Sequence, residues 1–165
     1  MSDEITRDLD FSTLERVNAS FVSEELEKRE SDMIWKLRFK SRTLYVYLLL
    51  EFQSTPDRWM ALRVFAYLAL LYQEIQKNAE KNKTEALEGG RLPPVLPIVL
   101  YKGVGEWRHP TNIKDLIMMP EGFPTRHLPD LEFMLIDENG FANEPMSAKK
   151  NLVTALFALE NSRDG

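Results

Sequence analysis

The residues best suited to chemistry stand at the end of an apolar stretch, YVYLLLEFQST (45–55), which carries Glu51 and Gln53. A run this apolar is typical of a buried β-strand, and side chains two positions apart lie on the same face of a strand. A carboxylate and an amide therefore point the same way where the strand ends. Upstream, Asp32 directly precedes the alternating segment MIWKLRF (33–39), which predicts a partner strand.

The two segments predict an antiparallel hairpin with its turn at Ser41–Arg42. One face is then wholly apolar and pairs Phe39 with Leu44, Leu37 with Val46, Trp35 with Leu48 and Met33 with Leu50. The other face pairs Arg38 with Tyr45, Lys36 with Tyr47, Ile34 with Leu49 and Asp32 with Glu51. A slip of one residue would mix the two faces, so the hydrophobic pattern favours this pairing.

This register has a chemical consequence, because two carboxylates directly across a ladder lie about 4.5–5.5 Å apart at Cβ and repel each other. A divalent cation between Asp32 and Glu51 would offset the repulsion, since Mg²⁺ prefers carboxylate oxygens and keeps several waters. The backbone carbonyl of Phe52 is a further candidate ligand, and Gln53 could hold a metal-bound water. Alternatively, both acids meet solvent, or a proton or Arg63 relieves the repulsion. The hairpin alone does not choose between these readings.

Other polar side chains could serve the same face. Lys36 and Arg38 continue it and could contact a phosphate. On the helix predicted after Gln53, Arg63 and Tyr67 lie one turn apart. They could approach the metal face, or Arg63 could make a structural ion pair while Tyr67 packs in the core. Glu15 is a candidate accessory acid, or else a solvated residue of an N-terminal helix.

Composition sets the limits on function. The chain has 165 residues, enough for one domain with a core, and no cysteine, which excludes thiolate catalysis and disulfides. Its two histidines are far apart, so a zinc site is not predicted. A net charge of −5 argues mildly against broad nucleic-acid binding, although residues 28–42 are locally basic. The acidic N-terminus is not a secretory signal, and a cytoplasmic location is expected.

Further elements surround the hairpin. The pattern predicts one or two short helices in 12–29, a long helix over 56–80 with Thr55 as N-cap, strands at 95–101 and 131–137, and a final helix after Ser147. Strands that alternate with helices indicate an α/β domain with a mixed sheet.

The order of an acid, a hairpin, Glu-x-Gln and a helix resembles the PD-(D/E)XK nuclease superfamily. More closely, the chain resembles the recombination-promoting nucleases, a family also labelled YhgA-like putative transposases. Three stretches carry this resemblance: SFVSEELEKRESDMIWKLRF (20–39), LYVYLLLEFQSTPDRWMALRVFAYLALLY (44–72) and LPPVLPIVLYKGVGEWRHPTNIKDL (92–116). They cover well over half of the chain. Gln53 stands where many members of the wider superfamily have Lys, although this family is similar in carrying Gln.

The resemblance implies a restriction-endonuclease-like fold, a mixed β-sheet flanked by helices. It also implies a DNA endonuclease associated with recombination or with mobile DNA. Such an enzyme would hydrolyse phosphodiester bonds with Mg²⁺ as its metal cofactor, or with Mn²⁺ or Ca²⁺. Asp32 and Glu51 would ligate the metal. The alternative is a non-catalytic module that binds DNA or protein and keeps the fold.

The resemblance also bears on domain organisation. Residues 1–165 would form a single nuclease-like domain that lacks terminal segments usual in the family. A homodimer is compatible with this reading, because cutting both DNA strands commonly uses two sites.

Overall fold

The computed structural model describes residues 8–17, 32–51, 55–82, 87–137, 139 and 154. The strands in this part of the chain are β1 (Leu9–Arg16), β2 (Asp32–Phe39), β3 (Arg42–Glu51), β4 (Val95–Tyr101) and β5 (Met134–Asp137). The helical elements are α3 (Met60–Lys81) and the short 3₁₀ turns η3 (Glu88–Gly90), η4 (Ile113–Leu116) and η5 (Thr125–His127).

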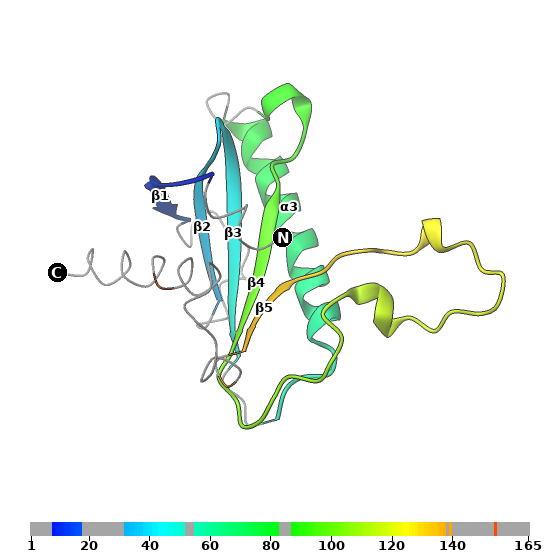
Figure 1. Ribbon diagram of the computed structural model, residues 1–165. Helices are drawn as coiled ribbons and strands as arrows, with labels where there is room; N and C mark the ends of the chain where they lie inside the picture. Colours follow the sequence, from blue (N-terminus) through cyan, green and yellow to red (C-terminus); the bar gives the residue numbers. More distant parts are fainter. Residues whose placement is uncertain are drawn as a thin grey trace.

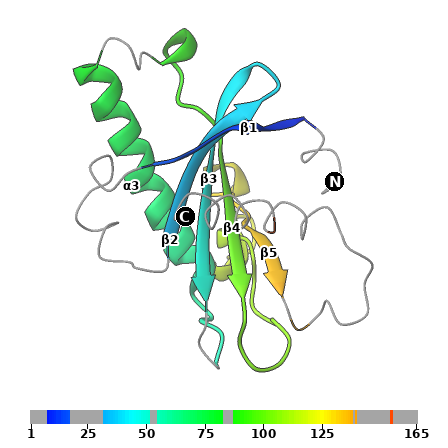
Figure 2. The same ribbon diagram turned by 90° about the vertical axis from the view of Figure 1, so that its left-hand side faces the viewer.

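The strands form one mixed sheet in the order β1-β2-β3-β4-β5 (Figure 2). The β1-β2 and β2-β3 pairs are antiparallel, whereas β3-β4 and β4-β5 are parallel. Helix α3 runs from β3 toward β4 and covers one face of the sheet (Figure 1). This crossover is what allows β3 and β4 to run in parallel. The predicted fold class, an α/β restriction-endonuclease-like mixed sheet, is confirmed.

The hairpin forms where expected, but its predicted register is wrong by two residues. The turn consists of Lys40 and Ser41, so Phe39 pairs with Arg42 and Asp32 with Leu49. Lys40 occupies the left-handed region with φ 55°. The turn lies one residue earlier than predicted, which shifts every facing pair by two residues. Asp32 therefore does not face Glu51.

The two faces of the hairpin are nevertheless those predicted, because a shift of two residues preserves the alternation. On the α3 side a core cluster includes Ile34, Tyr45, Tyr47 and Leu49 of the hairpin. On the opposite side a second cluster contains Trp35, Leu37, Leu44, Val46, Leu48, and Leu9 and Leu14 of β1. The central strands are thus buried on both faces, which explains their near-continuous apolar sequence.

Several predicted boundaries change. The N-terminal segment predicted as helical contains strand β1, an edge strand that pairs with β2 across an irregularity between Asp10 and Glu15. The long helix begins at Met60 rather than 56 and its N-cap is Trp59, so the prediction of Thr55 as N-cap is wrong. Strand β4 is confirmed, and β5 is shorter than 131–137. Residues 18–31 lie outside the described residues, as does the predicted final helix apart from Thr154.

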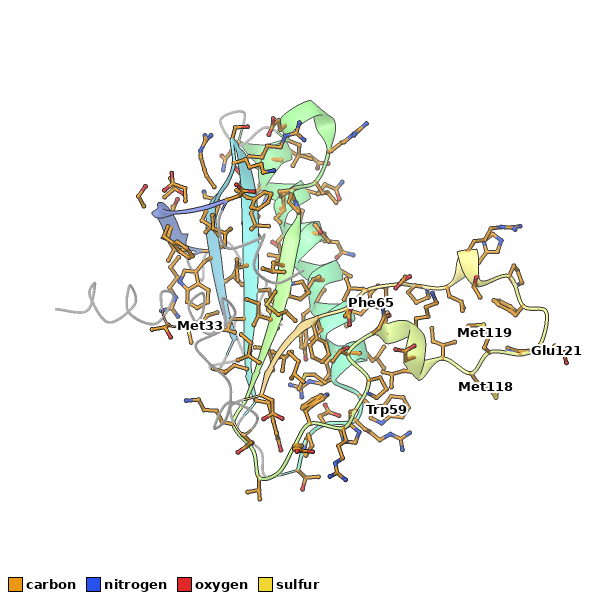
Figure 3. All side chains as sticks on the ribbon, in the orientation of Figure 1. Met33, Trp59, Phe65, Met118, Met119 and Glu121 are labelled. Carbon is orange, nitrogen blue, oxygen red and sulfur yellow. The ribbon has the colours of Figure 1, made fainter. Side chains whose placement is uncertain are left out.

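The chain between β4 and β5 leaves the sheet as a long arm, defined here as residues 111–133 (Figure 1). Backbone bonds close its base, from Ile113 N–H to Leu131 O (3.1 Å) and from Phe133 N–H to Thr111 O (3.1 Å). Figure 3 shows Met118, Met119 and Glu121 far out on the arm, and the Met118 side chain is 88% exposed. The base of the arm belongs to the fold, whereas its outer part extends beyond the sheet.

Candidate functional site

The carboxyl ends of the parallel strands define one edge of the sheet, which we call the carboxyl edge. Glu51, Tyr101 and Asp137 are aligned there across β3, β4 and β5. Figure 2 shows the three strands ending side by side at this edge. In open α/β sheets, ligand sites commonly form beyond the carboxyl ends of the strands.

Asp32 and Glu51 occupy neighbouring strands at this edge, in a diagonal relation. Asp32 pairs with Leu49, and Glu51 lies two residues further along β3. Such diagonal positions are about 7–8 Å apart in a sheet, still within the reach of long side chains. The register therefore removes the direct opposition of Asp32 and Glu51 that the sequence predicted. The structure describes only the backbone at Asp32 and Glu51.

The remaining predicted members of the metal site, Phe52 and Gln53, lie outside the described residues. The ligand set thus stays a prediction. Its chemistry fits a divalent hard cation, since carboxylate and carbonyl oxygens are the donors such ions prefer. Within the part of the chain that the structure describes, no group of three or more His, Cys, Asp or Glu side chains could hold a metal ion.

Asp137, which was not singled out from the sequence, organises the loop after β4. Its Oδ2 accepts a hydrogen bond from the Trp107 N–H (2.8 Å) and its Oδ1 accepts one from the Asn139 N–H (3.0 Å). The Asn139 side-chain amide donates to the Gly103 carbonyl at 2.7 Å. Trp107 in turn packs edge-on against Tyr101 at 5.3 Å between ring centroids. The loop is therefore fixed against the end of β5. The sequence signal that could have singled out Asp137 is an acid at the end of an apolar strand.

Arg63 lies in an ion pair with Asp57, the structural alternative considered for it. Its Nη1 donates to Asp57 Oδ2 at 2.9 Å, and the Arg63 and Asp57 side chains are 31% and 22% exposed. Burial raises the pKa of the Asp57 carboxyl. Hydrogen bonds from Arg63 and the Trp59 N–H, with the charges of Arg63 and His109, outweigh burial and lower that pKa below its usual 3.8. The pair fixes the segment that leads into α3.

The other predicted side chains also have identifiable surroundings. Glu15 lies on strand β1 and not on the predicted helix, and it forms an ion pair with Lys36 at 3.4 Å. Arg38 is exposed and donates to the Ser41 carbonyl in the hairpin turn at 3.0 Å. Tyr67 is buried in the α3-side core, where its ring lies 6.2 Å from that of Tyr47. The packing alternative for Tyr67 is therefore observed.

Comparison with known proteins decides the family. Residues 1–163 match the family described as "Putative transposase, YhgA-like". The chain belongs to this family. The match spans nearly all of the sequence and includes both strands that carry Asp32 and Glu51.

Several named proteins from Escherichia coli align with the chain at low identity. The chain is similar to recombination-promoting nuclease RpnC of strain K12, with 28% identity over 95 residues, 57% of this chain and 28% of that protein. It is similar to recombination-promoting nuclease RpnD of O157:H7, with 29% identity over 128 residues, 78% of this chain and 46% of that protein. It is also similar to inactive recombination-promoting nuclease-like protein RpnE of strain K12, with 26% identity over 125 residues, 76% of this chain and 38% of that protein.

Two further findings limit the comparison. The chain spans less than half the length of these three relatives, and no solved structure matches it. None of the helices that the structure describes combines the length and the apolarity that a membrane crossing requires.

Proposed function

We propose that the chain is a divalent-metal-dependent DNA endonuclease that hydrolyses phosphodiester bonds in recombination or mobile DNA. The observation that carries the proposal is the position of Asp32 and Glu51 on adjoining strands at the carboxyl edge. Membership of the family, and relatives named recombination-promoting nucleases, support the choice of DNA as substrate.

In this proposal the acids of the hairpin and Gln53 form the reaction centre. Asp32, Glu51 and the Phe52 carbonyl would hold Mg²⁺ or Mn²⁺, with Ca²⁺ as an alternative ion. The bound ion would supply Lewis-acid polarisation of the phosphate and lower the pKa of a water. The Gln53 amide would accept a hydrogen bond from the attacking water and orient it, without adding a positive charge.

Lys36, Arg38 and Arg63 are the proposed phosphate contacts. Arg38 is exposed near the hairpin turn, whereas Lys36 and Arg63 are held by Glu15 and Asp57. A phosphate would have to compete with these carboxylates or share the cation with them. The Lys36 pair is the easier one for a phosphate to displace, since its Glu15 partner is 65% exposed against 22% for Asp57, and exposed pairs contribute only about 0–1 kcal/mol.

The test is plasmid nicking with Mg²⁺, Mn²⁺ or Ca²⁺, comparing wild type with Asp32→Ala and Glu51→Ala. Glu121→Ala, which removes an exposed acid of the arm, is the matched control. We expect metal-dependent cutting that both site variants lose and the control retains. Cutting that survives in both site variants would overturn the assignment.

A second candidate function is a non-catalytic DNA-binding or protein-interaction module with the same fold. It is favoured by a relative that is named inactive, RpnE. Wild-type chain that binds DNA or a protein partner without nicking plasmid, with each ion, would support this candidate over the enzyme.

A further inference from the structure

An arginine and a tryptophan lie stacked on the surface where α3 begins. The guanidinium of Arg58 lies 4.6 Å from the centroid of the Trp59 ring, and the Trp59 side chain is still 46% exposed. Arg58 is also exposed, and it forms no ion pair with the residues that the structure describes. A large aromatic surface and a positive charge are thus presented together to solvent.

The backbone beneath this pair is fixed by contacts that do not use either side chain. Asp57 Oδ1 accepts the Trp59 N–H at 2.8 Å, while Asp57 Oδ2 accepts from Arg63 at 2.9 Å. The Arg63 N–H donates to the Trp59 carbonyl at 3.0 Å. The indole is therefore held on a rigid base without being needed to close the core, and a rigid contact loses less entropy on binding.

The pair lies at the same end of the molecule as the proposed cleavage site. Trp59 is eight residues after Glu51, and Figure 3 shows it at the end of α3 that lies beside the carboxyl edge. Both ribbon views place the start of α3 beside the ends of β3 and β4 (Figures 1 and 2).

We propose that Arg58 and Trp59 bind DNA that has unpaired bases next to the scissile phosphate. The indole would stack on a base outside a continuous duplex stack, and Arg58 would contact the adjoining phosphate. Stacking on an aromatic side chain is open to any base with a free face, and a nearby cation strengthens it. The inference rests on the proposed function for its substrate, but it concerns binding and can be tested without cleavage.

The competing explanation is that Arg58 only covers part of an apolar ring, as long basic side chains do. The chain offers matched controls for this. Leu62 is 47% exposed, one turn further along α3, and removal of its side chain tests loss of exposed apolar surface. Arg91 is exposed and follows η3, at the opposite end of the sheet, and its removal tests loss of one positive charge.

The experiment measures anisotropy of labelled oligonucleotides in EDTA, so that no strand is cut. The probes are a single strand, a blunt duplex and a duplex with an overhang. We expect Trp59→Ala to weaken binding of the single strand and the overhang about tenfold, with little effect on the blunt duplex. Trp59→Phe should retain most of the affinity. Arg58→Ala should weaken all three and reduce the slope of log affinity against log salt by about one.

The controls and the nicking assay separate the possible failures. Leu62→Ala and Arg91→Ala should bind like wild type. Trp59→Ala that binds the single strand as tightly as wild type, an equal loss in Leu62→Ala, or no DNA binding by wild type would each overturn the inference. Binding that depends on Trp59 without any nicking would overturn the enzyme and leave the contact standing. Nicking and DNA binding that are unchanged in both Trp59→Ala and Arg58→Ala would overturn the contact and leave the enzyme standing.

Discussion

At the scale of single residues, two of the proposed phosphate contacts already have carboxylate partners in the fold. Lys36 and Arg63, which the sequence presents as phosphate contacts, are held by Glu15 and Asp57. The sequence could predict the residue types but not these partners, because Glu15 and Asp57 meet them only once β1 and the segment before α3 are in place. The ion pairs set the energy that a phosphate must overcome to recruit either side chain.

Arg63→Ala should destabilise the chain by about 1–2 kcal/mol at pH 7, since it removes a charged hydrogen bond from a partly buried carboxylate. Folding lowers the pKa of Asp57. The stabilisation of the fold by its charged carboxylate is therefore complete at pH values above the usual pKa of 3.8, and it is lost as the pH falls through the folded-state pKa. The gap between variant and wild type should therefore shrink below about pH 4. Urea unfolding at pH 7 and pH 3 measures both.

Asp57→Asn and the double variant complete a thermodynamic cycle for this pair. We expect a coupling energy of about 1 kcal/mol at pH 7. A gap between Arg63→Ala and wild type that stays constant across this pH range would show that Arg63 stabilises the fold through packing alone.

At the scale of elements, the pattern of apolar residues predicted faces better than boundaries. The two faces of the β2–β3 hairpin are correct, because alternation fixes them whatever the turn. The predicted register is wrong, because a shift of two residues leaves the same alternation. Only the position of the turn distinguishes the predicted register from the observed one. The turn residues, Lys40 and Ser41, include no Gly, Asn or Asp to mark a tight turn in the sequence.

Strand β1 shows a different limit. Its sequence, LDFSTLER, contains Leu14 at a helical interval from Val17 and suggested a helix. As an edge strand it pairs with β2, an interaction that local sequence does not encode. Tertiary pairing thus overrode a weak local preference.

The hairpin turn gives the prediction at this scale. Lys40 has φ 55°, a conformation that disfavours a side chain by about 1 kcal/mol relative to glycine. Lys40→Gly should therefore be more stable than Lys40→Ala by about this amount. Both variants lose the exposed ion pair between Lys40 and Asp8, so the comparison isolates the backbone. Equal unfolding midpoints in urea would show that the turn relaxes when the side chain is removed.

At the scale of the whole molecule, the sheet gathers residues that are remote in sequence. Glu51, Tyr101 and Asp137 meet in one row only because β3, β4 and β5 are parallel and adjacent. Strand order cannot be read from spacing alone, and neither the role of Asp137 nor the position of Trp59 beside the carboxyl edge was predicted. The adjacency of the two strands that carry Asp32 and Glu51 was predicted because these strands are consecutive in sequence, whereas the predicted facing of the two acids was wrong.

The arm should be separable from the fold. Its base is closed by bonds between Thr111, Ile113, Leu131 and Phe133, so replacing residues 118–127 with a six-residue Gly/Ser linker should change the free energy of unfolding by less than about 1 kcal/mol. Phe133→Ala, at the buried base, should instead cost about 3–5 kcal/mol. Urea unfolding compares the two. A loss of similar size for both changes would mean that the outer arm contributes to the core.

Metal linkage tests the carboxyl edge as part of the whole fold. An ion that binds only the folded chain at about 100 times its Kd stabilises by about 2.7 kcal/mol, or about 5–10 °C in Tm for a domain of this size. We expect this rise with Mg²⁺, measured against EDTA by thermal unfolding. Asp32→Asn and Glu51→Gln should abolish it, and Glu121→Ala should retain it. An equal rise in Asp32→Asn would place the ion elsewhere.

Without metal, the change in Tm that these variants cause should reverse its sign. Because Asp32 and Glu51 are diagonal neighbours on β2 and β3, their repulsion in EDTA is modest, about 0.2–0.5 kcal/mol at this separation. Asp32→Asn should then melt at or slightly above the wild type in EDTA and clearly below it in Mg²⁺. A variant that is less stable in both conditions by the same amount would mean that Asp32 supports the hairpin rather than a cation. A reversal of the order of melting temperatures between EDTA and Mg²⁺ thus separates a metal ligand from a structural acid without any measurement of activity.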